Sequence, residues 1–332
     1  MKLVFFNDFT LGVLQGSNVH DVSAAVKDVP HVTPQDLISG VIYHFDVLRS
    51  KIEAEASKSR GVPRNQVRLR APLPRPTHMV NMAANYLENG FIKQLRPINA
   101  FLKSPESVIG NGDTLVLPPE KATIFHHEAE LGGVIGKPAR NVSAANAYDY
   151  LFGYVNYVDG SARGLGGGSF YWGKSWDTFC PMGPCIVTAD EIKDPQNLHV
   201  RMWVNGDARH DYNTSDMAYN IRRCVEWSTH VTLLEPGDVI AFGTNHQGIG
   251  AIQNGDVVEM EIDGLERLTF RVQDDLHREW PHGIDHEMAD RVAGRTPPPA
   301  AGQAGQQPVT RPPVIGHQDV PPPSTRVIPG PR

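Results

Sequence analysis

The sequence of 332 residues predicts an α+β fold in which β-strands dominate. From about residue 72 onward, short β-branched and aromatic segments alternate with turn-forming residues, a pattern typical of strands. Before that point, a segment with helical periodicity follows short strand-like stretches. From about residue 294 the composition changes to Pro, Gly, Ala and Gln, which marks the end of the folded part. A chain of this length can bury a substantial core.

Residues 1–71 are expected to form a small N-terminal α+β domain. Residues 3–6 and 12–14 read as short strands, and Thr33 is placed to cap a helix. Pro34 suits the first helical position and Asp36 suits the positive end of the helix dipole. The apolar residues that follow recur at three- and four-residue spacing, which predicts one continuous amphipathic helix. These residues are Leu37, Val41, Phe45, Leu48 and Ile52.

The rest of the chain divides by composition. Residues 72–76, with three prolines, form a stiff joint, and residues 72–275 are expected to form a larger, strand-rich domain. Residues 276–293 read as a C-terminal extension. Residues 294–332 are proline-rich and contain no Phe, Tyr or Trp, so we expect a disordered tail with polyproline II character.

The bulk properties narrow the classes of partner. The net charge of −6 and the pI of about 6.1 give no electrostatic reason to expect nucleic acid or an anionic membrane as a partner. The chain has no apolar stretch of membrane-spanning length, and its first residues form too short an apolar run for a signal peptide. The cysteines Cys180, Cys185 and Cys224 form no C-x-x-C pair, which suggests free thiols and a cytoplasmic location.

Glu128 and Glu130 are the most informative residues of the chain. Residues 124–136 read as one strand, on which side chains two positions apart share a face. His126, Glu128 and Glu130 would then project together. Neighbouring carboxylates repel each other unless a positive charge lies between them, and a hard divalent cation fits that requirement. The alternative is a charged strand face that points into water.

Further motifs identify a family resemblance. Residues 153–159 read as a second strand that ends in Asp159, and more short motifs follow at residues 160–164, 173–179, 181–184, 236–238 and 243–246. In order and spacing these motifs resemble the fumarylacetoacetate hydrolase family, from about residue 75 to 272. The resemblance implies a mixed β-roll or β-sandwich domain in which Glu128, Glu130 and Asp159 hold one Mg²⁺ or Mn²⁺, with Ca²⁺ as an alternative. It also implies a homodimer.

The resemblance implies roles for residues around the metal. Lys174 is similar to the lysine that contacts the substrate's oxygens beside the metal, and Thr244 belongs to a turn that binds the substrate's carboxylate. Asn85 and Tyr86 match the start of the family's substrate-site motif, Asn-Tyr-x-x-His-x-x-Glu. Arg163 has two interpretations: its planar fork suits a substrate carboxylate, or it forms a salt bridge that orients a metal-ligating carboxylate.

The sequence departs from the family at the residues that activate water. Asn89 and Ile92 stand where that motif places its histidine and glutamate, which lie on a short lid helix. A different base is therefore required for hydrolysis. His126 is the first candidate, because a nearby charge would tune its pKa towards neutrality. A hydrogen bond from His126 to a metal-ligating carboxylate is the competing role, and Glu88 or a metal-bound hydroxide are the other candidate bases.

The function that these features predict is metal-dependent hydrolysis of a C–C bond in a small 1,3-dioxo acid, such as an acylpyruvate, through an enolate. Such an activity belongs to the breakdown of aromatic compounds. A decarboxylase, hydratase or keto–enol tautomerase acting on a 2-oxo acid at the same metal site is the alternative. A non-catalytic protein that binds the metal and a small acid is the third interpretation.

Overall fold

The computed structural model describes residues 1–165 and 168–295, so that almost all of the expected tail, residues 294–332, lies outside the described residues. The described residues form a strand-rich α+β structure, which confirms the predicted fold class. None of its helices is both long enough and apolar enough to cross a lipid bilayer.

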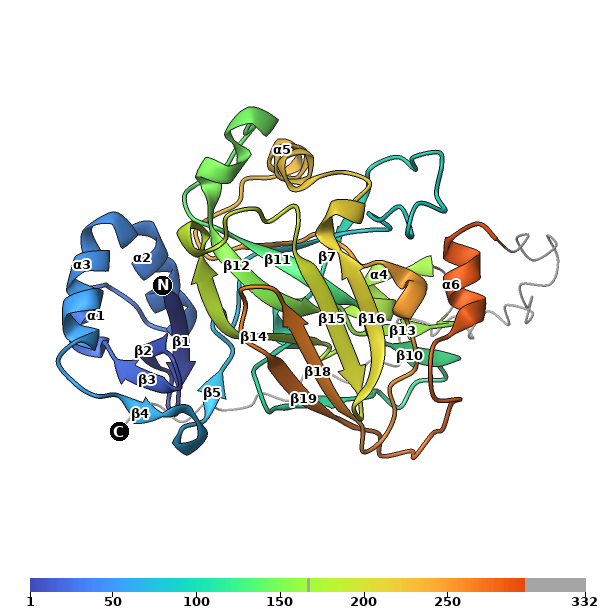
Figure 1. Cartoon of the computed structure of the whole chain (residues 1–332), viewed down its shortest axis with the longest axis horizontal. Coiled ribbons are helices and arrows are strands. Elements are labelled where there is room, and N and C mark those ends of the chain that lie inside the picture. Colours follow the sequence, from blue (N-terminus) through green and yellow to red (C-terminus); the bar gives the residue numbers. More distant parts are fainter. Residues whose placement is uncertain (166–167, 296–332) are drawn as a thin grey trace, which may run out of the picture. The chain divides into compact units, whose positions relative to one another are not determined.

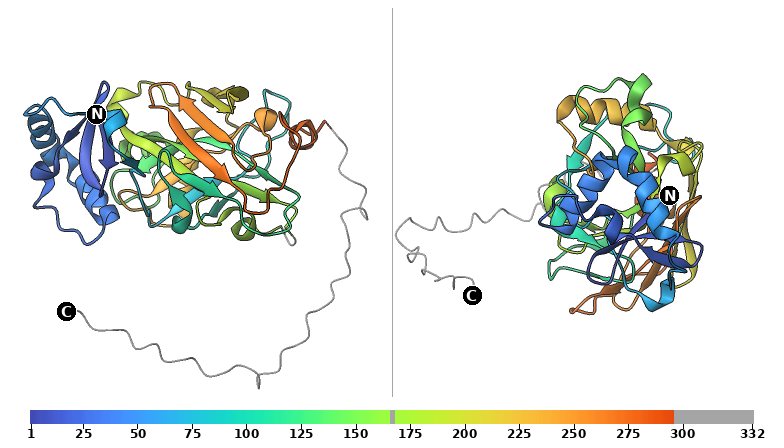
Figure 2. Two further views of the ribbon diagram at one scale, coloured as in Figure 1. Left: turned by 90° about the horizontal axis from the view of Figure 1, so that it is seen from below. Right: turned by 90° about the vertical axis from the view of Figure 1, so that its left-hand side faces the viewer.

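The first strands form an antiparallel meander in which β1 pairs with β2 and β2 pairs with β3 (Figure 1). Two short strands extend this meander, β4 beside β3 and β5 beside β1. The bounds are β1 (Lys2–Phe6), β2 (Thr10–Gln15), β3 (Asn18–Asp21), β4 (Val62–Pro63) and β5 (Leu69–Arg70). Leu3 and Phe5 of β1 and Leu11 and Val13 of β2 share a buried core with three helices, α1 (Ser23–Val26), α2 (Pro34–Tyr43) and α3 (Phe45–Ala56). Figures 1 and 2 show these helices together on one side of the meander.

The predicted start of α2 is confirmed. Thr33 accepts a hydrogen bond from the Asp36 backbone N–H at 3.2 Å, and the Asp36 carboxylate accepts one from the Thr33 N–H at 2.9 Å. The prediction of one continuous helix is wrong, because His44 leaves the helical conformation with φ −102° and ψ 18°. The break lets Phe45 begin α3 and pack edge-on against Phe152, with ring centroids 4.8 Å apart.

The large sheet continues from β1 into the larger part of the chain. β1 pairs antiparallel with β14, through Lys2 with Val187 and Leu3 with Ile186. The order β1-β14-β12-β11-β17-β6-β7 follows, with β8 beside β14. The bounds are β14 (Cys180–Thr188), β12 (Leu151–Val158), β11 (Ala129–Ile135), β17 (Val239–Ala241), β6 (Met79–Met82), β7 (Ala100–Leu102) and β8 (Val108–Ile109).

The central strands of this sheet are buried on both faces, which explains their nearly continuous apolar sequences. Val155 and Tyr157 face the core shared with the N-terminal helices, whereas Tyr154 and Val158 face a second core. A five-stranded sheet covers that second face, in the order β16-β15-β18-β19-β9. Its strands are β16 (Asp207–Asn213), β15 (His199–Val204), β18 (Val257–Ile262), β19 (Leu268–Gln273) and β9 (Thr114–Val116).

The remaining elements lie outside the two large sheets. They are the strand pair β10 (Ile124–His126) and β13 (Ser161–Arg163) and the helices α4 (Phe170–Lys174), α5 (Ile221–Val231) and α6 (His286–Val292). Short 3₁₀ helices lie at η1 (Arg64–Gln66), η2 (Pro105–Ser107), η3 (Ala144–Tyr150), η5 (Ala189–Glu191), η6 (Thr214–Asp216) and η7 (His246–Gly248).

Candidate active site

Glu128, Glu130 and Asp159 meet where β11 and β12 lie side by side. The two strands are antiparallel, Ala129 lies opposite Val158, and the Asp159 N–H donates to the Glu128 carbonyl at 2.9 Å. One carboxylate oxygen from each residue lies within 4.8 Å of the others. All three residues are buried, so the alternative of a strand face open to water is excluded.

This donor set fits a hard divalent cation. It offers only carboxylate oxygens, which Mg²⁺, Mn²⁺ and Ca²⁺ prefer. Burial, together with the negative charges of Asp159 and Glu128, raises the pKa of Glu130 well above its usual range. A cation between the three carboxylates would remove the repulsion that contributes to this shift. The cluster therefore has the composition, the spacing and the electrostatic need of a metal site.

The prediction that residues 124–136 form one strand is wrong. β10 ends at His126 and β11 begins at Ala129, and the two strands belong to different sheets. Glu128 lies in the connection between them. The change of sheet separates His126 from the carboxylate cluster, and its side chain turns to other partners.

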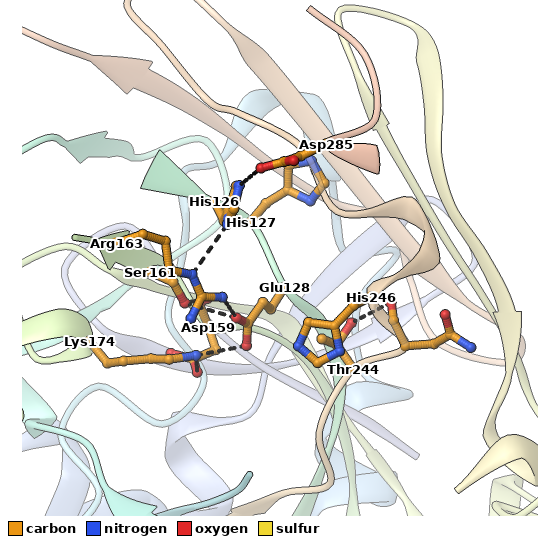
Figure 3. A network of polar contacts seen from close by, with 12 residues as sticks. His126, His127, Glu128, Asp159, Ser161, Arg163, Lys174, Thr244, His246 and Asp285 are labelled. Atoms are coloured by element: carbon orange, nitrogen blue, oxygen red, sulfur yellow. Dashed lines mark hydrogen bonds and ion pairs between the residues drawn. The ribbon is translucent and has the colours of Figure 1, made fainter. Parts of the chain in front are cut away.

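Two lysines balance negative charge in the cluster. Lys174 donates to Glu128 Oε2 at 2.8 Å and to Asp159 Oδ2 at 2.6 Å, and the fully buried Lys103 donates to Asp159 Oδ1 at 2.5 Å (Figure 3 shows the Lys174 contacts). Burial favours the neutral amine of Lys174, but Asp159 and Glu128 outweigh this effect and raise its pKa. Sequence reasoning placed Lys103 in a stretch that follows the family pattern but assigned it no role, because the sequence does not show that Lys103 reaches Asp159.

Arg163 joins the cluster to His126. Its Nη2 donates to Glu128 Oε1, its Nε donates to His126 Nδ1 at 3.2 Å, and His126 Nε2 in turn contacts Asp285 Oδ2 at 3.0 Å (Figure 3). Burial would raise the pKa of Glu128, but Lys174 and Arg163 hold it well below its usual range. In this position Arg163 makes the salt bridge to a cluster carboxylate that is one of its two expected roles.

His126 is buried and neutral. Burial, followed by the charge of Arg163, lowers its pKa to about 4, not the near-neutral value expected from the sequence. Because Nδ1 accepts from Arg163, the ring proton is on Nε2, which donates to Asp285. Both ring nitrogens are therefore engaged.

A cavity of about 170 Å³ opens onto the cluster. Its polar wall includes the three carboxylates with Lys174, Arg163, Thr244 and His246. Its apolar wall includes Phe101 and Phe170, whose rings stack at 4.6 Å, and Met288 and Val292 of α6. Ligand pockets more commonly reach roughly 300–1,000 Å³, so this cavity suits a small molecule.

Thr244 reaches the cavity through a tight turn after β17. Gly243 in that turn has φ +88°, and its N–H donates to Glu130 Oε2 at 2.8 Å. A Cβ at Gly243 would approach the Met82 carbonyl to 3.2 Å, so the position favours glycine for conformation and for space. The turn thus fixes Thr244 and a cluster carboxylate together.

Asn85 and Tyr86 are not brought to this cavity. The Asn85 side chain donates to the carbonyls of Phe242 and Tyr219 at 2.9 and 3.0 Å. Tyr86 is buried and packs edge-on against Tyr212 at 5.0 Å. Both residues hold neighbouring loops in place.

A larger hollow of about 810 Å³ lies elsewhere, beside β4 and β5. Its two arginines are already engaged, Arg64 with Glu266 at 3.0 Å and Arg68 with Asp113 at 2.6 Å. Size alone does not identify the site, because the carboxylate cluster and two of its basic partners line the smaller cavity.

Residues 76–273 match the family described as Fumarylacetoacetate (FAA) hydrolase C-terminal. The chain belongs to the fumarylacetoacetate hydrolase family. It is 32% identical to a maleylpyruvate hydrolase of Aquipseudomonas alcaligenes over 289 residues, which are 82% of this chain and 99% of that protein. It is 35% identical to an oxaloacetate tautomerase of Bacillus subtilis strain 168 over 224 residues, or 63% and 74% of the two chains.

Solved structures of family members share this fold. The maleylpyruvate hydrolase from Sphingobium sp. SYK-6, solved with manganese(II) and pyruvate, superposes with a TM-score of 0.76 at 34% identity and covers 82% of this chain and 99% of its own. A 2-hydroxyhepta-2,4-diene-1,7-dioate isomerase from Mycobacterium marinum gives 0.65 at 30% identity, with coverage of 83% and 99%. A cation-binding carboxylate cluster in this chain agrees with the manganese in the first of these relatives.

The family's lid positions hold no acid–base pair here. The Asn89 side chain accepts from Asn245 Nδ2 at 2.9 Å, and Ile92 carries no titratable group. The neighbouring Glu88 is buried and accepts from His246 Nδ1 at 2.8 Å. Sequence reasoning quoted His246 in the Gly-Thr-Asn-His motif but assigned it no role, because only folding brings residues 88 and 246 together.

The C-terminal extension closes the cavity. α6 supplies Met288 and Val292 to the wall, and Asp285 at its start contacts His126. Gln247 donates to the Ala289 carbonyl at 3.2 Å, and Arg96 donates to the Val292 carbonyl at 2.7 Å. Residues 276–293 are thus part of the site, although they lie beyond the segment that matches the family.

Proposed function

We propose that this protein is a metal-dependent hydrolase that cleaves the C–C bond of a small acylpyruvate, a maleylpyruvate-like acid, through an enolate. The observation that carries the proposal is the buried cluster of Glu128, Glu130 and Asp159 at the wall of a cavity of about 170 Å³. The two maleylpyruvate hydrolases support it further, because their similarity extends over nearly their whole length.

The chain's own residues have distinct tasks in this reaction. A Mg²⁺ or Mn²⁺ held by the three carboxylates would supply Lewis-acid polarisation of the substrate's oxo groups. Lys174 lies against Glu128 and Asp159 and would donate to the oxygen on which negative charge develops as the enolate forms. Thr244, in its turn after Gly243, would receive the substrate's carboxylate.

The apolar wall and Arg163 complete the proposed site. Phe101, Phe170 and Met288 would exclude bulk water, which strengthens the electrostatic interactions inside. Arg163 would orient Glu128 through their ion pair, and its exposed fraction of 24% also leaves it open to a substrate carboxylate. Both of its expected roles are therefore parts of the proposal.

A keto–enol tautomerase acting on a 2-oxo acid is the second candidate. Asn89 and Ile92 favour it, because a chain without the lid pair lacks the usual means to activate water. The similarity to oxaloacetate tautomerases supports the same reading. Enolate formation requires the same cation and lysine but no attack by water.

Product analysis distinguishes these functions. The full chain is incubated with an acylpyruvate and with oxaloacetate, in Mn²⁺, in Mg²⁺ and in a chelator. Two carboxylic acids from the acylpyruvate, formed only with metal, support the hydrolase. Keto–enol conversion without loss of carbon supports the tautomerase, and CO₂ release supports a decarboxylase. Binding without turnover of either compound contradicts an enzymatic role.

Several finer points belong to the same proposal. They are magnesium as the cation in cells, a homodimer, a cytoplasmic location and a place in the breakdown of aromatic compounds. The division into domains at residues 1–71, 72–275 and 276–293 is also proposed, with residues 294–332 as a tail.

A further inference from the structure

Glu88 and His246 form a buried pair beside the carboxylate cluster. His246 Nδ1 lies 2.8 Å from Glu88 Oε1, and the His246 backbone N–H donates to Glu88 Oε2, also at 2.8 Å. Gln247 Nε2 donates to the same oxygen at 2.9 Å. Glu88 is 1% exposed and His246 is 8% exposed. A carboxylate held by three donors fixes the imidazole firmly.

The geometry determines which ring nitrogen can accept a proton. An ionised Glu88 only accepts hydrogen bonds, so Nδ1 of His246 must carry the ring proton. Nε2 therefore holds the lone pair, and it makes no hydrogen bond to any residue within 1–165 and 168–295. His246 lines the same cavity as Glu128, Glu130 and Asp159, and Figure 3 shows its ring beside Thr244 with one edge turned towards Glu128.

The backbone around Glu88 is strained in a way that supports this arrangement. Glu88 has φ +56° and Asn89 has φ +57°, a region that residues other than glycine rarely adopt. Such conformations persist where the surroundings enforce them, and they are frequent at functional sites. Asn245 Nδ2 donates to both Asn89 Oδ1 and Asp216 Oδ2, at 2.9 and 2.8 Å, and so holds the loop of His246 against that of Glu88.

Other candidate bases are less well placed. Both ring nitrogens of His126 are engaged, by Arg163 and Asp285, and His126 does not line the cavity. His127 and His210 are buried and bond to each other at 3.1 Å, also away from the cavity wall. Glu88 reaches the cavity only through His246.

We infer that His246 is the general base of this site and that Glu88 is its positioning residue. The inference rests on the proposed function. In hydrolysis, His246 Nε2 takes a proton from water as the water oxygen bonds to the distal carbonyl carbon. The C–C bond then breaks, its electron pair forms the pyruvate enolate, and the imidazolium returns the proton to the enolate carbon. In tautomerisation the same nitrogen removes a C3 proton from the substrate.

The first test uses kinetics. His246→Gln in the Mn²⁺-loaded full chain is expected to lower kcat by about 10²- to 10⁴-fold. Calorimetric Mn²⁺ affinity should stay close to that of the wild type, because His246 is not a cluster carboxylate. Glu88→Gln should lower kcat less, with little change in KM, and alter the pH–rate profile. His230→Gln, at an exposed histidine bonded only to Asn141, is the matched control and should behave as wild type.

The second test does not require turnover. In ¹⁵N-histidine spectra, the His246 ring should keep its proton on Nδ1, and its Nε2 resonance should shift when pyruvate is added with Mg²⁺. An unmoved resonance would overturn the inference, as would full activity in His246→Gln or a loss of kcat confined to His126→Gln. A shifted resonance in a protein that turns over neither acid would leave His246 in the site and reject the proposed function instead.

Discussion

The carboxylate cluster and the Glu88–His246 pair face one cavity but are built differently. The cluster comes from the ends of β11 and β12, two adjacent antiparallel strands whose register sets the positions of Glu130 and Asp159. The pair comes from two loops 158 residues apart in sequence, which are joined by hydrogen bonds from the His246 ring and backbone to Glu88 and from Asn245 to Asn89. Strand pairing fixes the positions of the metal ligands, so we expect them to tolerate substitutions in nearby residues. A base held between two loops is less constrained, and its position in the chain can change during evolution.

The two regions also differ in how charge is balanced. The cluster's carboxylates form ion pairs with Lys103, Lys174 and Arg163. The base pair contains a single carboxylate, Glu88, and one imidazole ring, His246. Substitutions in the cluster should therefore change metal binding and stability together, whereas those around the base should change the reaction but leave metal binding intact.

The largest effect is expected from Glu130→Gln. The amide keeps an oxygen for the Gly243 N–H but removes a charge from the cluster. Calorimetric binding of Mn²⁺ should be abolished, a loss beyond the 10–100-fold typical of residues outside the coordination shell. Glu279→Gln, at an exposed glutamate, is the control. Unchanged Mn²⁺ affinity in Glu130→Gln would reject the assignment of the site.

Lys103→Met should come next. It leaves Asp159 buried without one of its two lysine partners, and breaking a buried ion pair costs about 3–5 kcal/mol. Urea unfolding should show this loss in chelator and a smaller loss in Mn²⁺, because the cation compensates Asp159. Lys58→Met, which breaks an exposed pair with Glu55, should cost less than about 1 kcal/mol. Equal losses of unfolding free energy in the two variants would show that the buried pair of Lys103 and Asp159 adds no more stability than an exposed ion pair.

Met288→Ala tests the wall supplied by α6. Removing this side chain widens the cavity without touching the cluster, so the preference for a small acyl group over a larger one should fall by about tenfold. The measurement is kcat/KM for two acylpyruvates that differ in acyl size. Leu276→Ala, at an exposed apolar residue, is the matched control. An unaltered preference would show that α6 does not select the substrate.

The smallest effect is expected at Asp274, which binds Arg278 at the start of the C-terminal extension. Burial would raise the pKa of Asp274, but hydrogen bonds from Arg278 and from nearby backbone N–H groups lower it. Its stabilising contribution is thus present above the unfolded pKa of about 3.9 and is lost as the pH falls through the lower folded value. In Asp274→Asn, the unfolding free energy measured with urea should fall less steeply than in the wild type as the pH drops below about 4. Asp207→Asn, at an exposed carboxylate, should keep the slope of the wild type.

Sequence reasoning reached the cluster because its signal is local. The spacing of Glu128 and Glu130 indicated a paired site, and the family resemblance added Asp159 to it. The same reasoning misjudged the surroundings of His126, because spacing does not show that the chain changes sheets after residue 126. The break at His44 was missed for a similar reason, since the apolar spacing continues unchanged through both helices.

Lys103 and His246 could not be assigned a role from the sequence, and Glu88 was only one of several candidate bases. Each is a single polar residue whose role depends on a partner far along the chain. The contribution of α6 to the cavity wall was also not predicted, because residues 276–293 were interpreted only as a C-terminal extension. Contacts of this kind, between polar residues far apart in the sequence, can be identified only once the fold is known.

The pairing of β1 with β14 has a consequence for synthesis of the chain. Lys2 and Leu3 find their partners in β14 only when residues 186 and 187 have been made. This part of the β1 edge, unlike the part beside β5, therefore stays unpaired while the intervening chain is translated. The helices α1–α3 can cover one face of the early meander, but they cannot satisfy that edge. The nascent chain therefore passes through a stage that exposes it to aggregation and to chaperones, and slow translation before residue 187 should lower the yield of folded protein.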